Sequence, residues 1–299
     1  MKVFVTGVNG QLGHDVMLEL NQRGHECIGS DIADTPNTAE ISALPYARLD
    51  ITDGEAVNAV LVAVHPDAVI HCAAWTAVDA AEDEANKPVV YAVNVDGTAN
   101  IARACRTIDA KMTYISTDYV FDGRGTEPWQ PDCTEYHPVN VYGHTKLLGE
   151  QAVRETLEKY FIVRIAWVFG PNGKNFVKTM LNLGKTHDTL RVVNDQIGTP
   201  TYTYDLARLL VDMIETEKYG YYHATNEGGY ISWYDFTKEI YRQAGMTTKV
   251  IPVSTEEYGL SIAARPFNSR LDKSKLIESG LKPLPDWKDA VARYLKEMK

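Results

Sequence analysis

Residues 6–13 read Thr-Gly-Val-Asn-Gly-Gln-Leu-Gly, so that Gly7, Gly10 and Gly13 fall three residues apart. They follow an apolar run that is typical of a strand and open a helical pattern. Glycines with this spacing allow a tight turn, a close approach of backbone amides to a pyrophosphate, and close packing of helix on strand. The helix N-terminus adds unpaired N–H groups and the positive end of its dipole. The stretch therefore predicts a dinucleotide-binding βαβ unit.

The chain around this loop alternates strand-like and helix-like segments. Apolar runs of the length of a strand buried on both faces occur at Val3–Thr6, Glu26–Ser30, Ala68–Cys72, Met112–Ser116 and Phe161–Trp167. Helical stretches lie between them at Gln11–Arg23, Asp53–Val64, Val90–Ile108 and Val141–Lys159. This alternation predicts an α/β protein with a Rossmann doubly wound parallel sheet.

The regular alternation of strand-like and helix-like segments ends at Gly170-Pro171-Asn172-Gly173. We expect helices near 176–183 and 204–215, a helix that begins at Ser232, and a terminal helix at 287–298. An apolar run occupies 190–193, a short strand is expected at 249–253, and a late strand at 221–224 could return to the sheet. We therefore expect a smaller α/β C-terminal substrate-binding lobe. The NAD(P)-binding domain is predicted to span residues 1–168 plus about 195–225, and the lobe about 169–194 and 226–299.

Composition excludes several classes of protein. The 299 residues are 44% hydrophobic and 23% charged, which disfavours disordered or fibrous chains. The formal net charge of −10 disfavours nucleic acid and anionic membranes as partners. No run of 18 apolar residues and no basic leader is present, so we expect a cytoplasmic protein. Four cysteines without a C-x-x-C pair indicate reduced thiols rather than a zinc site.

Asp31 ends the second strand, where such folds place a carboxylate on the adenosine ribose hydroxyls. No Arg or Lys stands next to it in the sequence, so the 2′-phosphate of NADPH would meet an unshielded negative charge. This predicts a nicotinamide cofactor, with NADH favoured over NADPH. Asp50 and Ile51, after the third strand, are further candidates for contact with the adenine end.

Tyr142 and Lys146 stand four residues apart at the start of a predicted helix and so share one helix face. A free tyrosine has a pKa of about 10, too high for useful proton transfer at pH 7. An ammonium at about 5 Å and an effective dielectric constant of ~20 favours the phenolate by roughly 3 kcal/mol, or about two pKa units. The pair predicts a proton donor to a carbonyl oxygen, Tyr142, whose pKa Lys146 lowers while also holding the nicotinamide ribose.

Thr117 follows the strand that ends at Ser116, at the sheet edge where doubly wound folds bind ligands. We expect its hydroxyl to hydrogen-bond a substrate carbonyl and to tune the tyrosine.

The glycine loop, Ser116-Thr117-Asp118 and Tyr142-x-x-x-Lys146 together resemble the extended short-chain dehydrogenase/reductase superfamily, which acts on nucleotide sugars. Four longer stretches closely resemble dTDP-4-dehydrorhamnose reductases, and the resemblance covers essentially the whole chain. They are Ala73–Asp79 (AAWTAVD), Ser116–Gly123 (STDYVFDG), Val193–Thr201 (VNDQIGTPT) and Arg265–Asp272 (RPFNSRLD).

This resemblance implies that NAD(P)H reduces C4 of dTDP-4-dehydro-6-deoxy-L-mannose while a tyrosine protonates the oxygen. The product is dTDP-L-rhamnose, which is used for cell-surface polysaccharide. Tyr142 would be the proton donor, Lys146 its tuner and ribose anchor, and Thr117 the carbonyl partner. Implied cofactor contacts are Gly10, Gln11 and Leu12 at the pyrophosphate, Asp31, Asp50 and Ile51 at the adenosine, and Ala74, Trp75 and Thr76 along its length. Implied substrate contacts are Thr117, Asp118, Trp167 and Arg265.

Some members of this family bridge two subunits through a metal held by three carboxylates. The matching positions here are Asp15, Tyr204 and Glu297, so a phenol replaces one carboxylate. We therefore expect no metal site, doubt a role for Mg²⁺ and favour a monomer over a metal-bridged dimer.

Other activities on this fold need other residues. A 4,6-dehydratase typically has Asp-Glu after the threonine, but Tyr119 follows Asp118 here. A combined epimerase/reductase would want a cysteine beside this loop, and none is adjacent to Thr117. Another nucleotide-sugar 4-ketoreductase or a 4-epimerase uses the same Thr/Tyr/Lys set and stays open. So does a non-catalytic regulatory subunit, such as the β-subunit of methionine adenosyltransferase, because fold alone does not decide function.

Overall fold

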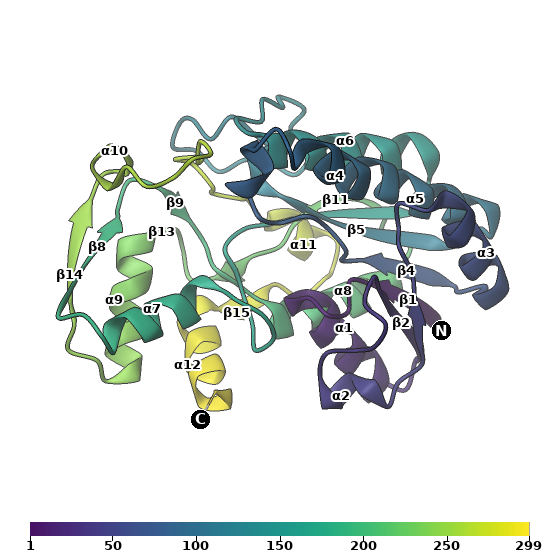
Figure 1. Cartoon of the computed structure of the whole chain (residues 1–299), viewed down its shortest axis with the longest axis horizontal. Coiled ribbons are helices and arrows are strands. Elements are labelled where there is room, and N and C mark those ends of the chain that lie inside the picture. Colours follow the sequence, from purple (N-terminus) through teal and green to yellow (C-terminus); the bar gives the residue numbers. More distant parts are fainter. Residues whose placement is uncertain (299) are drawn as a thin grey trace.

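The structure is a computed structural model that describes residues 1–298. Its main feature is a seven-stranded sheet in which every neighbouring pair of strands is parallel, in the order β11-β6-β5-β4-β1-β2-β3 (Figure 1). The strands are β1 (Lys2–Thr6), β2 (Glu26–Asp31), β3 (Tyr46–Arg48), β4 (Ala68–His71), β5 (Lys111–Thr117), β6 (Tyr160–Ile165) and β11 (Gly220–His223). The strand order reverses between β1 and β4, and ligands bind beside such a switch point at the carboxyl ends of the strands.

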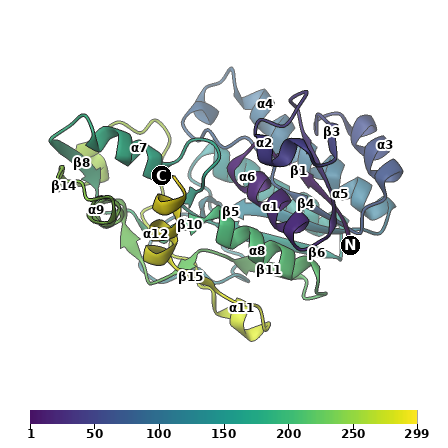
Figure 2. The same cartoon turned by 90° about the horizontal axis from the view of Figure 1, so that it is seen from below.

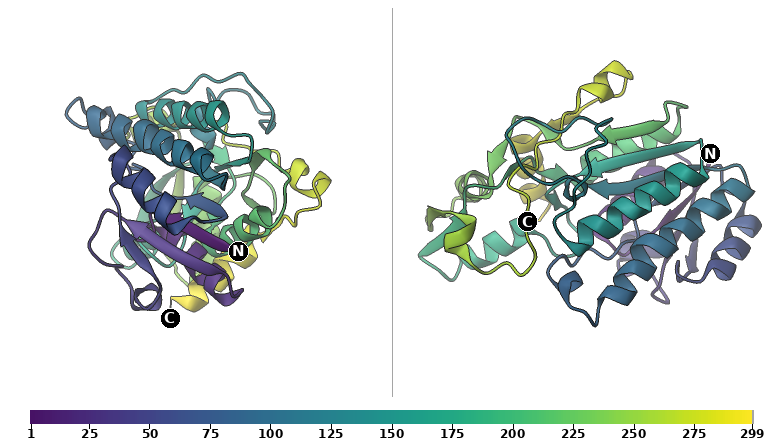
Figure 3. Two further views of the ribbon diagram at one scale, coloured as in Figure 1. Left: turned by 90° about the vertical axis from the view of Figure 1, so that its right-hand side faces the viewer. Right: turned by 90° about the horizontal axis from the view of Figure 1, so that it is seen from above.

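Helices cover both faces of this sheet, which confirms the predicted doubly wound α/β fold. One face carries α1 (Gln11–Gln22), α2 (Ala39–Ser42) and α8 (Thr203–Ile214). The other carries α3 (Gly54–Val64), α5 (Thr98–Thr107) and α6 (Val141–Thr156), which run side by side in the right-hand view of Figure 3. Each helical layer buries its own apolar cluster against the sheet.

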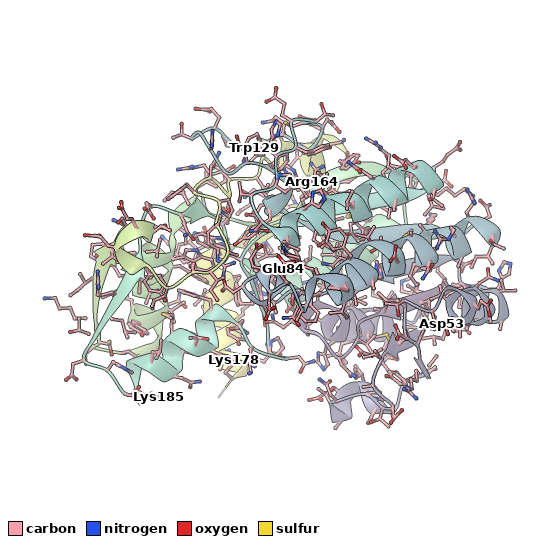
Figure 4. The ribbon with its side chains drawn as sticks, turned by 45° about the horizontal axis from the view of Figure 1, so that its top comes forward. Asp53, Glu84, Trp129, Arg164, Lys178 and Lys185 are labelled. Atoms are coloured by element: carbon pink, nitrogen blue, oxygen red, sulfur yellow. The ribbon has the colours of Figure 1, made fainter. Side chains whose placement is uncertain are left out.

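A second body lies beyond the carboxyl ends of the strands, at one end of the molecule (Figure 2). Its parallel pair β8–β14 packs with three helices around a separate apolar core. These elements are α7 (Phe176–Gly184), β8 (Thr189–Val193), α9 (Trp233–Ala244), β14 (Lys249–Val253) and α12 (Trp287–Glu297). In Figure 4, Lys178 and Lys185 mark the course of α7 in this body.

Short elements connect the two bodies. They form the strand pairs β7 (Val168–Phe169) with β10 (Thr201–Tyr202), β9 (Ile197–Gly198) with β13 (Ile231–Ser232), and β12 (Asn226–Glu227) with β15 (Leu284–Asp286). The remaining short helices are η1 (Ala80–Glu82), α4 (Lys87–Tyr91), η2 (Ala92–Gly97), η3 (Asp118–Val120), α10 (Thr255–Tyr258) and α11 (Ser274–Glu278). Within residues 1–298, no helix combines the length and apolar character needed to cross a bilayer.

Three predicted segments need correction. The strand expected over 161–167 ends at Ile165, because the chain turns at Trp167, whose φ of 51° lies in the left-handed region. The helix expected over 90–108 begins earlier, and the π-helical segment η2 interrupts it. The helix expected over 141–159 ends at Thr156, because Leu157 is already extended and buried. The late strand is confirmed as β11.

Candidate active site

The glycine loop joins β1 to α1 with almost no space for side chains. Gly7 has a φ of 70°, and a Cβ there would lie 2.6 Å from the backbone nitrogen of Ala73. A Cβ at Gly13 would collide with the carbonyl oxygen of Gly7. Helix α1 begins after Gly10 without a side-chain cap, so its first N–H groups are left for an anion. This geometry fits a dinucleotide pyrophosphate.

Two cavities meet at this loop, and Gly7, Gly10, Cys72 and Ala74 line both of them. The first, of about 370 Å³, is also lined by Asp31 and Ile51 and matches the predicted adenosine end. The second, of about 390 Å³, also contains Gln11, Leu12, Gly13, Thr76, Thr117, Asp118, Tyr142, Lys146 and Trp167. Most of the predicted site residues are therefore brought together in one continuous depression.

Asp31 turns its carboxylate toward the glycine loop, where one oxygen accepts the backbone N–H of Asn9 at 3.1 Å and the other that of Ile32 at 2.9 Å. Asp50 lines neither cavity: it is exposed, and its carboxylate accepts the backbone N–H and the hydroxyl of Thr52. Trp75 lines neither cavity, and its indole N–H donates to the carbonyl of Ala77 at 3.1 Å. Cofactor contacts of Asp50 and Trp75 stay predictions.

Helix α6 carries Tyr142 and Lys146 to the end of β5. Asn140 begins the helix, because its side chain accepts the N–H of Gly143 at 2.8 Å. The ring of Tyr142 meets that of Tyr119 edge-on, with centroids 5.6 Å apart, just after Thr117. The Lys146 side chain is buried, with its ammonium 4.1 Å from the centroid of the Tyr114 ring. Thr117, Tyr142 and Lys146 thus face the same cavity from two elements.

Burial dominates the electrostatics of this trio. It lowers the pKa of Lys146 to about 7, although the carboxylate of Glu150 acts in the opposite direction. It raises the pKa of Tyr142 above its ordinary value, and a hydrogen bond with Thr117 lowers that pKa only in part. The sequence-based prediction weighed the charge of the ammonium without the desolvation of the phenol. That Lys146 lowers the pKa of Tyr142 stays a prediction.

Glu150 lies one turn beyond Lys146 on α6, and its negative charge is neutralised by Arg164 of β6. Its carboxylate accepts from Arg164 at 2.8 and 2.7 Å and from the hydroxyl of Ser116 at 2.5 Å. Both charged side chains are almost fully buried. Figure 4 places Arg164 below the loop of Trp129, where its guanidinium also donates to the carbonyl of Pro131 at 3.0 Å. This buried pair fixes α6 to β5 and β6 directly behind the site.

Asp118 lies beside the trio and is only 2% exposed. One carboxylate oxygen accepts the hydroxyl of Thr117 at 3.0 Å, while the other has no hydrogen-bond partner among residues 1–298. Burial raises the pKa of Asp118 to about 6. A buried carboxylate with an unused acceptor on a cavity wall is suited to receive hydroxyl groups of a ligand.

Two tryptophans from distant segments form one wall of the cavity. Trp167 stacks on Trp233, the first residue of α9, with ring centroids 3.7 Å apart and an interplanar angle of 17°. Trp233 was not among the predicted site residues. The capping sequence Ser232-x-x-Asp235 indicates the start of a helix. No pattern in the neighbouring sequence indicates that this helix packs against Trp167.

Arg265 lines a third cavity, of about 440 Å³, together with Thr76, Tyr119, Arg191 and Trp233. Because Trp233 and Thr76 also line the cavity that holds Tyr142, the two spaces adjoin. Arg265 therefore lies at the outer part of the site, beyond the trio.

The three positions that matched metal ligands do not form a carboxylate cluster. Asp15 is buried and bonds His14 at 3.1 Å, and Glu297 accepts the hydroxyl of Tyr202 at 2.5 Å. Tyr204 is 40% exposed. Neighbouring Asp205 is buried and paired with Arg293. No group of three His, Cys, Asp or Glu side chains suited to a metal is found in residues 1–298. That Mg²⁺ has no role stays a prediction.

The fold and the site define a class: dinucleotide-binding α/β proteins whose threonine, tyrosine and lysine meet at the sheet edge, as in short-chain dehydrogenases/reductases. More particularly, the chain belongs to the family described as RmlD substrate binding domain, whose family model matches residues 1–299.

Individual relatives agree with this assignment. The dTDP-4-dehydrorhamnose reductase of Streptomyces griseus is 40% identical over 96% of this chain and 90% of its own. A solved dTDP-4-dehydrorhamnose reductase from Clostridium acetobutylicum is 42% identical, has a TM-score of 0.91 and covers 100% and 99% of the two chains. Another, from Bacillus anthracis in complex with NADP, is 40% identical, has a TM-score of 0.89 and covers 99% of both.

Proposed function

We propose that this chain is an enzyme that reduces the C4 ketone of dTDP-4-dehydrorhamnose with NAD(P)H to give dTDP-L-rhamnose. The observation that carries the proposal is the convergence of Thr117, Tyr142 and Lys146 in a cavity that continues to the glycine loop. Relatives named dTDP-4-dehydrorhamnose reductase, similar over nearly the whole chain, support the substrate.

The cofactor would supply a hydride to C4. Gly7, Gly10 and Gly13 leave space for its pyrophosphate, and the first N–H groups of α1, at Gln11 and Leu12, complement the negative charge. Asp31 and Ile51 would hold the adenosine, and Ala74 and Thr76 would lie along the cofactor. We keep NADH as the favoured cofactor because of Asp31, with NADPH accepted as well; a relative's complex with NADP supports its acceptance.

Tyr142 would donate the proton. A raised pKa keeps its phenol protonated at neutral pH, and an alcohol is a weaker acid than a phenol, so the oxygen that gains charge at C4 can take the proton. Thr117 would hold the same oxygen by a hydrogen bond, as an oxyanion donor does. Lys146, with its pKa lowered to about 7, would hold the ribose as a partly charged donor.

The sugar would lie between Asp118 and Trp167. The unused oxygen of Asp118 would accept sugar hydroxyls, and Trp167, supported by Trp233, would pack against the sugar ring. Arg265 would face the diphosphate, which lies further from C4. In this arrangement residues 1–168 and about 195–225 bind the cofactor, while about 169–194 and 226–299 form the substrate lobe.

We also propose that the protein works as a monomer without a bridging metal. The support is the phenol at Tyr204 in place of a carboxylate and the hydrogen bond that Glu297 accepts from Tyr202. Sedimentation with and without a chelator would test this, and a dimer that dissociates on chelation would contradict it.

The proposed activity is tested by following absorbance at 340 nm with NADH or NADPH, with the dTDP-4-keto-L-sugar generated in situ from dTDP-glucose. Wild-type protein should oxidise the cofactor, and Tyr142→Phe should lower kcat by at least about 100-fold. Product analysis separates reduction at this sugar from another ketoreductase or an epimerase. Cofactor binding without oxidation would favour the epimerase or the regulatory subunit.

A further inference from the structure

A turn in the C-terminal segment, Ala263–Pro266, contributes Arg265 to the wall of the 440 Å³ cavity and is held by Asp79, the last residue of the Ala73–Asp79 stretch. One oxygen of Asp79 accepts the backbone N–H of Ala263 at 3.0 Å. The other accepts from the guanidinium of Arg265 at 2.5 Å. A single carboxylate thus fixes both the backbone of the turn and its one charged side chain.

The same turn is tied to the start of α6. The side chain of Asn140 donates to the carbonyl of Ala264 at 2.8 Å and at the same time accepts the N–H of Gly143. Glu82, just beyond Asp79, accepts the N–H of Val141 at 2.8 Å. The turn, the 79–82 segment and the first residues of the helix that carries Tyr142 therefore form one connected set of hydrogen bonds.

Arg265 has spare bonding capacity in this arrangement. Its Nη2 is engaged by Asp79, while its Nη1 is buried with no hydrogen-bond partner among residues 1–298. The side chain is 19% exposed and lines the 440 Å³ cavity with Arg191. A guanidinium with one nitrogen fixed and another unpaired is prepared to pair with an anion.

We propose that Asp79 is a positioning residue for substrate binding: it holds Arg265 and its turn so that the guanidinium meets the diphosphate of the nucleotide sugar. Asp79 does not touch the reacting atoms and acts through Arg265. The inference rests on the proposed function for the sugar, but its ligand is the nucleoside diphosphate, whose binding is measured without turnover.

The test uses the full chain and dTDP as the probe, with binding followed by tryptophan fluorescence because Trp233 lines the same cavity. Asp79→Asn keeps an acceptor for Ala263 but loses the charge that fixes Arg265. We expect the Kd of dTDP and the KM of the nucleotide sugar to rise about tenfold, while kcat and the KM of the nicotinamide cofactor change less than about threefold. Asp109→Asn is the matched control, since Asp109 pairs with Lys159 on an exposed surface outside the site.

A double-variant comparison decides whether Asp79 acts through Arg265. In an Arg265→Gln background, adding Asp79→Asn should change the Kd of dTDP less than about twofold. An equal tenfold effect in that background would overturn the proposal, as would a change in kcat or cofactor KM as large as that in dTDP binding. Wild-type protein that binds dTDP but reduces no sugar would refute the proposed function and leave this test intact; failure to bind dTDP at all would refute the inference itself.

Discussion

Arg48 lies directly opposite Asp31, because the two residues pair in register between β3 and β2. The Nε of Arg48 donates to the carbonyl of Ile32 at 3.2 Å, and its guanidinium makes an exposed ion pair with Asp34 at 3.3 Å. The sequence showed no cation beside Asp31, but the fold supplies one. The proposed adenosine end would therefore offer both a carboxylate for a ribose hydroxyl and a nearby cation for a 2′-phosphate.

This relationship predicts which variants change the choice of cofactor. Arg48→Gln should lower kcat/KM for NADPH by roughly fivefold and leave NADH nearly unchanged, since an exposed charge contributes about 1 kcal/mol. Asp31→Asn should raise the NADPH/NADH ratio, because it removes the repulsion. Arg154→Gln, an exposed arginine near the end of α6, serves as the control. Equal losses for the two cofactors in Arg48→Gln would contradict the assignment.

Lys146 predicts a pH dependence. Burial lowers its pKa to about 7, so the ammonium is present below that pH and is lost above it. We expect kcat/KM for the cofactor, which reports the free enzyme, to fall as pH rises through about 7. Lys146→Arg should move this fall beyond the accessible range at reduced activity, because a guanidinium stays charged. If kcat/KM of the wild-type enzyme for the cofactor did not change up to pH 9, the predicted titration of Lys146 would be wrong.

Asp118 is expected to support activity while lowering the stability of the folded protein at neutral pH. Burial raises the pKa of Asp118 to about 6, so above pH 6 the buried charge lowers the free energy of unfolding. This destabilisation vanishes as the pH falls toward 3.8, the ordinary pKa of the group. At pH 7.5, Asp118→Asn should therefore be at least as stable as the wild type, with a free energy of unfolding higher by up to about 3 kcal/mol. This gain in stability should disappear near pH 4, and thermal unfolding at the two pH values would measure it. Activity should fall at least about tenfold. The prediction would be refuted if the stability of the variant relative to wild type were lower at pH 7.5 than at pH 4.5.

The stacked tryptophans predict a substrate effect. Trp233→Leu removes the ring that supports Trp167 and should raise the KM of the nucleotide sugar by up to about tenfold, the range expected for an aromatic pair. Tyr234→Leu removes an aromatic ring from the next position of α9, which lines none of the three cavities described above, and should leave KM unchanged. Steady-state kinetics with varied sugar nucleotide would check both, and similar KM values for the two variants would exclude a role for the stack.

The sequence by itself determined the parallel sheet, the glycine loop and the placement of Tyr142 and Lys146 on one face of a helix. These depend on patterns within one strand, one turn or one helix, where spacing fixes which side chains share a face. Thr117 was also predictable, because a residue that ends a buried parallel strand lies at the ligand-binding edge.

Tertiary structure alone decided the partners that come from distant segments: Arg48 beside Asp31, Trp233 on Trp167, and Asp79 on Arg265. It also decided the pKa values of Tyr142 and Lys146, because desolvation depends on everything packed around a group and outweighs the charge of a neighbour four residues away. Packing brings such residues together through loops whose paths no local pattern specifies.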